Sequence, residues 1–259
     1  MIFAGLCVVA YGVAAFAAHR ARRALLFGAG SAAVLLHAVA LLGDVFHDGV
    51  LHIGLLEAVS LVLWQASLLL LLSWRFMPVV LLATITFPLS GAMAIIAAWP
   101  TATRTGASVE GWPLQLHVGL SVFAAGLFTL AALQSILLAF QSRYLHSGAD
   151  PGGLRNLPPL QSMESALFGA LWLAWGMLSA SLLTGILFVD DLLAQHLVHK
   201  TVLSVVSWAV FLMLLWGHWR YGWRGRTALR WTWTGYAVLL TAYFGSKFVL
   251  EALLGQHWG

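Results

Sequence analysis

Charged residues are scarce in this chain. Lysine, arginine, aspartate and glutamate make up 8% of its 259 residues, and apolar residues make up 61%, whereas a soluble domain carries about 25% charged residues. A water-soluble globule of this length could not cover its surface with so few charges. The net charge of +4 comes from scattered arginines beside long apolar runs, not from one basic face. The composition therefore excludes a soluble enzyme and a nucleic-acid-binding protein.

Cysteine is almost absent, because Cys7 is the only one. One thiol cannot form an internal disulfide, a cysteine-rich zinc site or an iron–sulfur cluster. The chain also lacks a Cys-x-x-Cys-His sequence, so it cannot attach haem covalently in the c-type manner. The first apolar run, 2–18, precedes its basic residues, which reverses the order found in a signal peptide. We therefore expect this run to be retained as a membrane span.

Long apolar runs dominate the rest of the sequence. A hydrocarbon core about 30 Å thick requires about 20 apolar residues per helix. The runs and their polar breaks predict eight transmembrane helices: 2–18, 24–43, 53–73, 78–98, 114–140, 163–189, 201–219 and 228–254. The predicted fold class is therefore all-α, a polytopic transmembrane helix bundle. The connections 99–113 and 141–162 are longer and rich in proline and glycine, but neither is long enough for a soluble domain.

Positive charge is distributed unevenly among the predicted loops. One side of the membrane carries ten arginines: Arg20, Arg22, Arg23, Arg75, Arg143, Arg155, Arg220, Arg224, Arg226 and Arg230. The other side carries only Arg104, Lys200 and Lys247. Because cytoplasmic loops carry the excess of lysine and arginine, we expect both termini to lie outside, in a periplasm or its equivalent.

Histidine is the informative polar residue, since ten are present in a chain with few other titratable groups. A neutral imidazole is the usual axial ligand of haem iron and a common ligand of zinc or copper. Solvation in a loop is the simpler interpretation for His47, His146 and His196. Three others differ in position: His37 lies inside the second span, His117 opens the fifth and His218 closes the seventh.

Two intramembrane polar residues allow two interpretations each. His37 needs a partner in an apolar span, and Glu57 on the next, antiparallel span lies at a similar depth, about 7–9 Å below the outer helix ends. The sequence therefore leaves open a His37–Glu57 hydrogen bond or a ligand role. Lys247 either pairs with Glu251 one turn later or provides a cation for a carboxylate of a bound ligand.

Three segments in the second half of the chain stand out from the apolar background. They are His117-Val118-Gly119-Leu120-Ser121, the segment 214–226 with its Gly-Trp-Arg-Gly-Arg loop, and Ala242-Tyr243-Phe244-Gly245. Together they resemble the cytochrome c assembly family, which includes the CcsA, CcmC and HemX groups. The pattern is similar to that of the YpjD-type inner-membrane proteins, a HemX-like branch. The resemblance covers 114–255 well and the first four spans loosely, so it implies four N-terminal transmembrane helices over 1–98 and a four-helix assembly-like domain over 114–255.

The resemblance implies non-covalent binding of b-type haem. His117 matches an external haem-ligand histidine of the family, and His218 matches an intramembrane histidine near the inner side. His257 lies about one helical turn beyond the place of a second external histidine, so His117 and His257 are the expected iron ligands, with His199 as the alternative to His257. The expected propionate partners are Lys247, Lys200 or Arg104, and His37 is a further candidate for haem binding.

Two departures from the family pattern bear on activity. The tryptophan-rich external motif is absent between the sixth and seventh spans, and the Asp-Pro-Lys of the family domain is represented at most by Lys200. We therefore do not expect a complete cytochrome c synthetase, and we expect the protein not to be an enzyme.

The first expected function is haem handling, in haem export or cytochrome c biogenesis, by a multi-pass protein of the bacterial inner membrane. Its expected partners are the lipid bilayer, haem and a further membrane protein of haem delivery or transport. The alternative is a regulatory or accessory subunit of a transporter or biosynthetic enzyme, without bound haem. A transporter of another substrate would favour broken helices with paired intramembrane charges, and this chain has few such residues.

Overall fold

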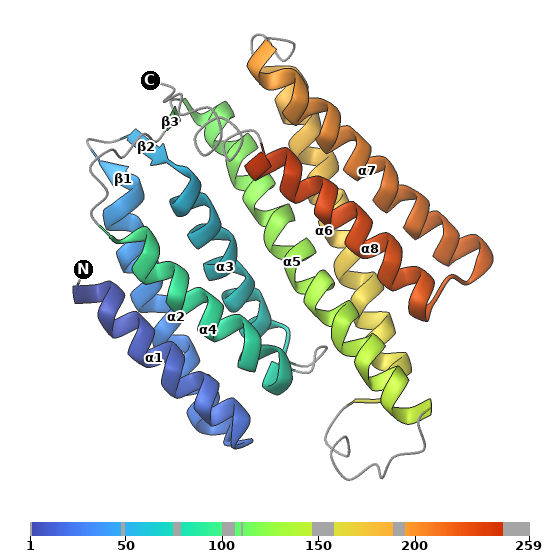
Figure 1. The fold of residues 1–259 in the computed structure, drawn as a ribbon. Helices are drawn as coiled ribbons and strands as arrows, with labels where there is room; N and C mark the ends of the chain where they lie inside the picture. The colour runs from blue at the N-terminus through green and yellow to red at the C-terminus, as the bar shows by residue number, and fades with distance from the viewer. Residues whose placement is uncertain are drawn as a thin grey trace. The chain divides into compact units, whose positions relative to one another are not determined.

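The computed structural model describes residues 2–47, 50–74, 79–99, 107–109, 111–146, 158–188 and 195–245. Seven of the described helices are long and apolar enough to cross a membrane (Figure 1). They are α1 (Ile2–His19), α2 (Arg23–Val45), α3 (Leu55–Leu72), α4 (Val79–Ala97), α5 (Trp112–His146), α6 (Leu160–Phe188) and α7 (Gln195–Tyr221). The eighth, α8 (Gly225–Leu240), continues in a π-helical turn, Thr241–Gly245. The predicted polytopic helical bundle is confirmed.

Several helix ends differ from the predicted spans. The fifth helix extends to His146 instead of ending at 140, and the seventh begins at Gln195 instead of 201. Residues 195–200, predicted as part of an outer loop, are therefore helical. Polar residues at a helix end break the apolar run without breaking the backbone hydrogen bonds, which explains why hydropathy alone gave spans that were too short. The predicted end of the last span, 246–254, lies outside the described residues.

Large apolar side chains are exposed on the outward surfaces of the described helices. Examples with at least half of the side chain exposed are Leu35, Leu42, Leu72, Leu183, Ile186 and Leu187. Such surfaces would favour aggregation of a water-soluble protein, but they match a hydrocarbon environment, where apolar side chains are the stable choice. The helices therefore contact the lipid bilayer.

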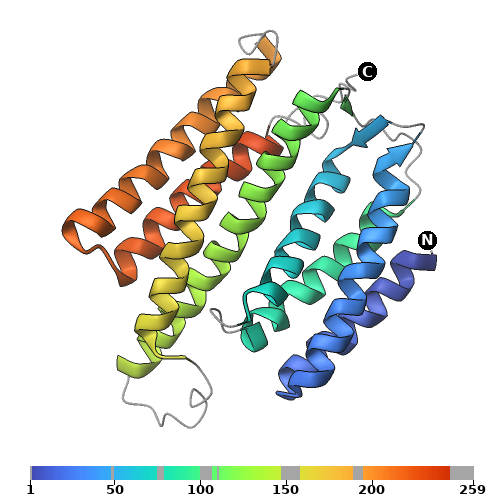
Figure 2. The ribbon, with the colours of Figure 1, turned by 180° about the vertical axis from the view of Figure 1, so that it is seen from behind.

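The chain divides into two compact units. The N-terminal unit contains α1 to α4 and three short strands, and the C-terminal unit contains α5 from Leu116 onward, α6, α7, α8 and the π-helical turn. Within each unit, consecutive helices run in opposite directions (Figures 1 and 2).

Small residues bring the helices of the N-terminal unit together. Five buried residues of α1 are spaced alternately three and four positions apart: Ala4, Cys7, Tyr11, Ala14 and Ala18. This spacing keeps one face of α1 on its neighbours α2 and α4. On α4, Gly91 meets that face, because a Cβ added there would lie 3.4 Å from the Cβ of Tyr11.

A three-stranded antiparallel sheet joins two connections of the N-terminal unit. β1 (Phe46–His47) pairs with β2 (Val50–Ile53), and β2 pairs with β3 (Ala107–Val109). No strand was predicted in either connection, and the composition of 99–113 predicted turns. Strands of two to four residues are too short to show a run of alternating apolar and polar residues, so they left no detectable pattern.

The C-terminal unit is held by aromatic stacking and one glycine. Phe211 of α7 stacks on Phe128 of α5, with 3.9 Å between ring centroids. The same ring occupies the space beside Gly235 of α8, where an added Cβ would lie 2.8 Å from it. Ser207 of α7 donates a hydrogen bond to the Gly235 carbonyl at 2.9 Å. Glycine at position 235 therefore lets α8 approach α7 closely.

Candidate functional site

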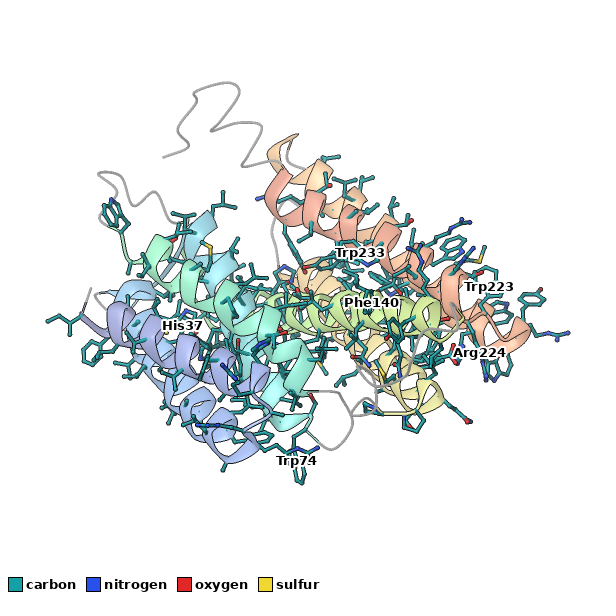
Figure 3. All side chains as sticks on the ribbon, turned by 60° about the horizontal axis from the view of Figure 1, so that its bottom comes forward. His37, Trp74, Phe140, Trp223, Arg224 and Trp233 are labelled. Atoms are coloured by element: carbon teal, nitrogen blue, oxygen red, sulfur yellow. The ribbon has the colours of Figure 1, made fainter. Side chains whose placement is uncertain are left out.

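His37 lies in the core of the N-terminal unit and is 1% exposed (Figure 3). Its Nε2 lies 2.9 Å from the hydroxyl of Ser60 on α3, and its Nδ1 lies 3.3 Å from the hydroxyl of Tyr11 on α1. The two aromatic rings of Tyr11 and His37 meet edge to face, 5.8 Å apart. A hydroxyl can donate or accept, so this pair of partners satisfies either tautomer of the imidazole. Both ring nitrogens are thus engaged within the bundle.

The prediction that His37 is buried and hydrogen-bonded is confirmed, but its predicted partner was wrong. Glu57 lies in the first turn of α3, and its carboxylate turns back over the N-cap residue Gly54. The first N–H groups of a helix lack intrahelical partners and carry partial positive charge, which favours a carboxylate there. Ser60, one turn deeper on the same helix, contacts His37 instead.

His117 lies in the second turn of α5 and is half-buried against α6. Its Nδ1 is 2.9 Å from the main-chain carbonyl oxygen of Ser181 and 3.3 Å from the hydroxyl of Thr184. A carbonyl oxygen only accepts, so Nδ1 carries the proton and donates it. In a neutral ring, Nε2 then keeps its lone pair. No hydrogen-bond partner of Nε2 lies within the part of the chain that the structure describes.

Hydroxyl groups hold α5 beside α6 and beside the end of α8 around His117. Ser121 contacts the Ser181 hydroxyl at 2.6 Å, and Tyr243 of the π-helical turn donates to the Ser121 carbonyl at 3.3 Å. Ligation of one iron by His117 and His257 would require the first and last helices of this unit to be neighbours. The contact between Tyr243 and Ser121 shows that α5 and the end of α8 are neighbours. His257 itself lies outside the described residues.

His218 lies near the end of α7 and shows the same arrangement of ring nitrogens. Its Nδ1 is 2.8 Å from the main-chain carbonyl oxygen of Trp223 and therefore donates to it. Its ring stacks on Phe168 of α6, with 3.4 Å between centroids. The ring is half-buried, and no partner of its Nε2 lies among the described residues.

The turn between α7 and α8 brings the Trp223 carbonyl to His218. Gly222 has φ +67°, a left-handed conformation that favours glycine, and its N–H bonds to the His218 carbonyl at 3.0 Å. The Trp223 N–H bonds to the carbonyl of Gly217 at 3.2 Å. The Trp223 indole covers Gly217 so closely that an added Cβ would overlap the ring. The Gly-Trp-Arg-Gly-Arg segment, 222–226, which carries part of the resemblance to the family, thus folds back on α7 and orients His218.

Two further contacts fix this turn. Trp223 stacks on Trp231 of α8, with 5.5 Å between centroids. Arg224 Nε lies 3.7 Å from a carboxylate oxygen of Glu164 on α6. Figure 3 shows Trp223 and Arg224 together at this end of the C-terminal unit. The turn is therefore attached to α6, α7 and α8.

His117 and His218 lie at different levels of the C-terminal unit. Their contacts on α6, Ser181 and Phe168, are 13 residues apart, which corresponds to about 20 Å along a helix axis. The two rings cannot ligate the same iron. Each is a separate candidate site.

For the other predicted site residues, the structure gives fewer contacts or none. Lys200 is half-buried in the first turns of α7. His199 lies on the same helix, but its side chain is outside the described set, and Arg104 and Lys247 lie outside the described residues altogether. Among the described residues, no three His, Cys, Asp or Glu side chains gather as a metal site. Single imidazoles suit haem iron, which needs one or two protein ligands, better than zinc, which needs three or four.

The family model described as "Cytochrome C assembly protein" matches residues 25–254. The chain belongs to this family. The match begins in α2, so the likeness extends through most of the N-terminal unit, which the sequence analysis considered only loosely similar. The family predicted from the segments around His117 and His218 is confirmed.

Curated relatives agree with this membership. The chain is 34% identical to Inner membrane protein YpjD of Escherichia coli (strain K12) over 138 residues, 53% of this chain and 52% of that protein. It is 35% identical to "Uncharacterized 28.8 kDa protein in nifR3-like 5'region" of Azospirillum brasilense over 185 residues, 71% of this chain and 67% of that protein. It is 26% identical to Protein HemX of Brevibacillus brevis over 134 residues, 51% of this chain and 49% of that protein.

The aligned part spans about half the length of the YpjD and HemX relatives. No solved structure matches the chain. The relatives' names and the seven membrane-length helices confirm the predicted location, a multi-pass protein of the inner membrane.

Proposed function

We propose that this chain binds haem non-covalently and handles it in the membrane, for haem export or cytochrome c biogenesis, without being an enzyme. The proposed iron ligands are His117 at one level and His218 at another. One observation carries the proposal: both rings donate Nδ1–H to a main-chain carbonyl and leave Nε2 without a partner among the described residues. Family membership supports it.

A carbonyl acceptor on Nδ1 prepares an imidazole for iron. It fixes the tautomer, orients the ring and raises the basicity of Nε2, as seen in metal-ligating histidines generally. Haem supplies four further iron ligands from its porphyrin ring. The surrounding helices supply apolar walls, and Phe168 against His218 is one such wall. The residues present therefore fit a flat, mostly apolar cofactor.

The remaining ligands and partners extend the same proposal. His257 is the proposed second ligand at the His117 site, as the resemblance to the family implies. Lys200 and Lys247 are the proposed propionate partners. A membrane protein of haem delivery is the proposed partner protein. His37, with both ring nitrogens engaged by hydroxyls, is proposed as a structural residue.

An absorption spectrum of the purified protein tests this function. We expect a Soret band that decreases in His117→Ala and in His218→Ala and disappears when both are replaced. His19→Ala is the matched control, since His19 is exposed at the end of α1 and has no assigned role. A protein that is folded but binds no added haem would contradict the proposal and favour the accessory-subunit alternative.

A further inference from the structure

We propose that Thr184 and Gly185 of α6 are positioning residues, which hold the His117 imidazole with Nδ1 against α6 so that Nε2 is left for a ligand. The inference deepens the proposed function and rests on His117 being an iron ligand. Neither residue was among the site residues predicted from the sequence.

Thr184 contributes an acceptor. Its hydroxyl donates to the carbonyl oxygens of Ala180, at 3.0 Å, and Ser181, at 2.9 Å. With its own proton used on the helix, the oxygen can only accept from His117 Nδ1, which lies 3.3 Å away. The Ser181 carbonyl at 2.9 Å accepts the same proton. Two acceptors on one side of the ring therefore exclude the tautomer with the proton on Nε2.

Gly185 contributes space. A Cβ added there would lie 3.1 Å from His117 Cε1, 3.4 Å from Nδ1 and 4.0 Å from Nε2. The first distance is shorter than ordinary van der Waals contact, so alanine would push the ring away from α6 and lengthen the bond from Nδ1 to the Ser181 carbonyl. Of the two ring nitrogens, Nε2 is the more distant from this helix position.

The same helix offers a matched control. Gly176 of α6 has nothing within 4 Å of an added Cβ. Alanine raises helix stability by about the same amount at either glycine, so a difference between Gly185→Ala and Gly176→Ala reports only the contact with His117.

The first measurement is the ring ¹⁵N spectrum of ¹⁵N-histidine-labelled protein in lipid bilayers, without haem. The His117 signals are assigned by their loss in His117→Ala. At a pH where the imidazole is neutral, we expect the proton on Nδ1 in the wild type and in Gly176→Ala, and a mixture of tautomers in Gly185→Ala. Thr184→Val is expected to shift the Nδ1 signal, and Thr184→Ser to restore it.

The second measurement is a haem titration followed at the Soret band. Removing groups that orient a metal ligand typically costs 10- to 100-fold in affinity. The titration is done in a His218→Ala background, so that only the His117 site reports. We expect a fall of at least about tenfold for Gly185→Ala, with unchanged affinity in Gly176→Ala. Thr184→Val should weaken binding less, because the Ser181 carbonyl remains.

The two measurements separate the two proposals. A wild-type protein without haem affinity would contradict the proposed function alone, while the nitrogen spectrum would still decide whether α6 fixes the tautomer. Unchanged His117 signals in Gly185→Ala would overturn the positioning role. Changed signals with wild-type haem affinity would overturn it as well, because the orientation would then not serve a ligand.

Discussion

The two units of this protein use histidine in opposite ways. In the N-terminal unit, His37 bonds through both ring nitrogens to side-chain hydroxyls from two other helices. In the C-terminal unit, His117 and His218 each bond through Nδ1 to a main-chain carbonyl. Hydroxyls accept either tautomer, whereas a carbonyl selects one and leaves a lone pair on the other nitrogen. The type of hydrogen-bond partner therefore distinguishes a structural histidine from a candidate iron ligand, although all three rings lie between apolar helices.

The largest expected effect on stability comes from His37→Leu. The substitution removes the imidazole from two buried hydroxyls, Tyr11 and Ser60. The Tyr11 hydroxyl is also within reach of Ser67, and a buried group left unsatisfied costs about 1–3 kcal/mol. Ser60 can turn to a carbonyl of its own helix, so we expect a total loss of about 2–3 kcal/mol. Denaturation followed by far-UV circular dichroism measures it. Haem binding per folded molecule should remain unchanged.

His117→Leu is the counterpart in the C-terminal unit. We expect it to lower haem occupancy, with the His218 site left in place. It should cost less than about 1 kcal/mol of stability, because the Ser181 carbonyl and Thr184 keep their bonds within α6. If His37→Leu removed haem and His117→Leu removed stability, the comparison between the units would be reversed.

After His37→Leu, the next largest effect on stability is expected from Gly217→Ala. The added methyl group would overlap the Trp223 indole, and such overpacking typically costs about 1–3 kcal/mol. The indole must move, and the carbonyl that orients His218 moves with it. Denaturation and haem titration are compared with Gly176→Ala, which meets no neighbour. Equal stability of the two variants would show that the turn adapts without strain.

Double-mutant cycles sharpen the assignment of partners in the N-terminal unit. His37→Ala and Tyr11→Phe share a hydrogen bond, so their free energies of unfolding should differ from additivity by about 1 kcal/mol. His37 and Glu57 have different partners, so the changes in the free energy of unfolding caused by His37→Ala and Glu57→Gln should add to within about 0.5 kcal/mol. Coupling between His37 and Glu57 as large as that with Tyr11 would restore the partner expected from the sequence.

The smallest effect is expected at the ion pair of the α7–α8 turn. Arg224 is 64% exposed and its Nε lies 3.7 Å from Glu164, and pairs of this kind contribute less than about 1 kcal/mol. Arg224→Ala should therefore lower the denaturation midpoint only slightly more than Arg226→Ala, in which no ion pair of the described residues is lost. A loss as large as that in Gly217→Ala would mean that the ion pair, not the indole, holds the turn.

The helices were predictable because a membrane imposes a length and a composition on every span. Apolar runs of about 20 residues gave the number and approximate bounds of α1 to α7. Depth along a helix was also predictable, since His37 does bond to α3 within one turn of Glu57. Rotation about the helix axis was not, because hydropathy does not show which face of an apolar helix meets which neighbour. Tyr11 on α1 was missed for that reason.

The candidate site was predictable only in part. The resemblance pointed to His117 and His218, but the groups proposed to orient them are two main-chain carbonyls, the Thr184 hydroxyl and Gly185. Main-chain carbonyls have no residue type, so no sequence pattern reveals them. The cluster of Ser181, Thr184 and Gly185 near the end of α6 was the available signal, since small and hydroxyl residues are enriched where membrane helices pack closely.

The short turn between α7 and α8 has a practical consequence for mapping the orientation of the chain. Only three residues, 222–224, separate the two helices, and they carry both the left-handed Gly222 and the carbonyl bound by His218. A reporter domain inserted there would show on which side of the membrane the turn lies, but it would also break the hydrogen bond between His218 and the Trp223 carbonyl. The connection between α5 and α6, 147–159, is 13 residues long and carries Arg155, on the same predicted side of the membrane as the α7–α8 turn. An insertion near residue 150 would reveal the sidedness of that end with the proposed iron ligands left in place.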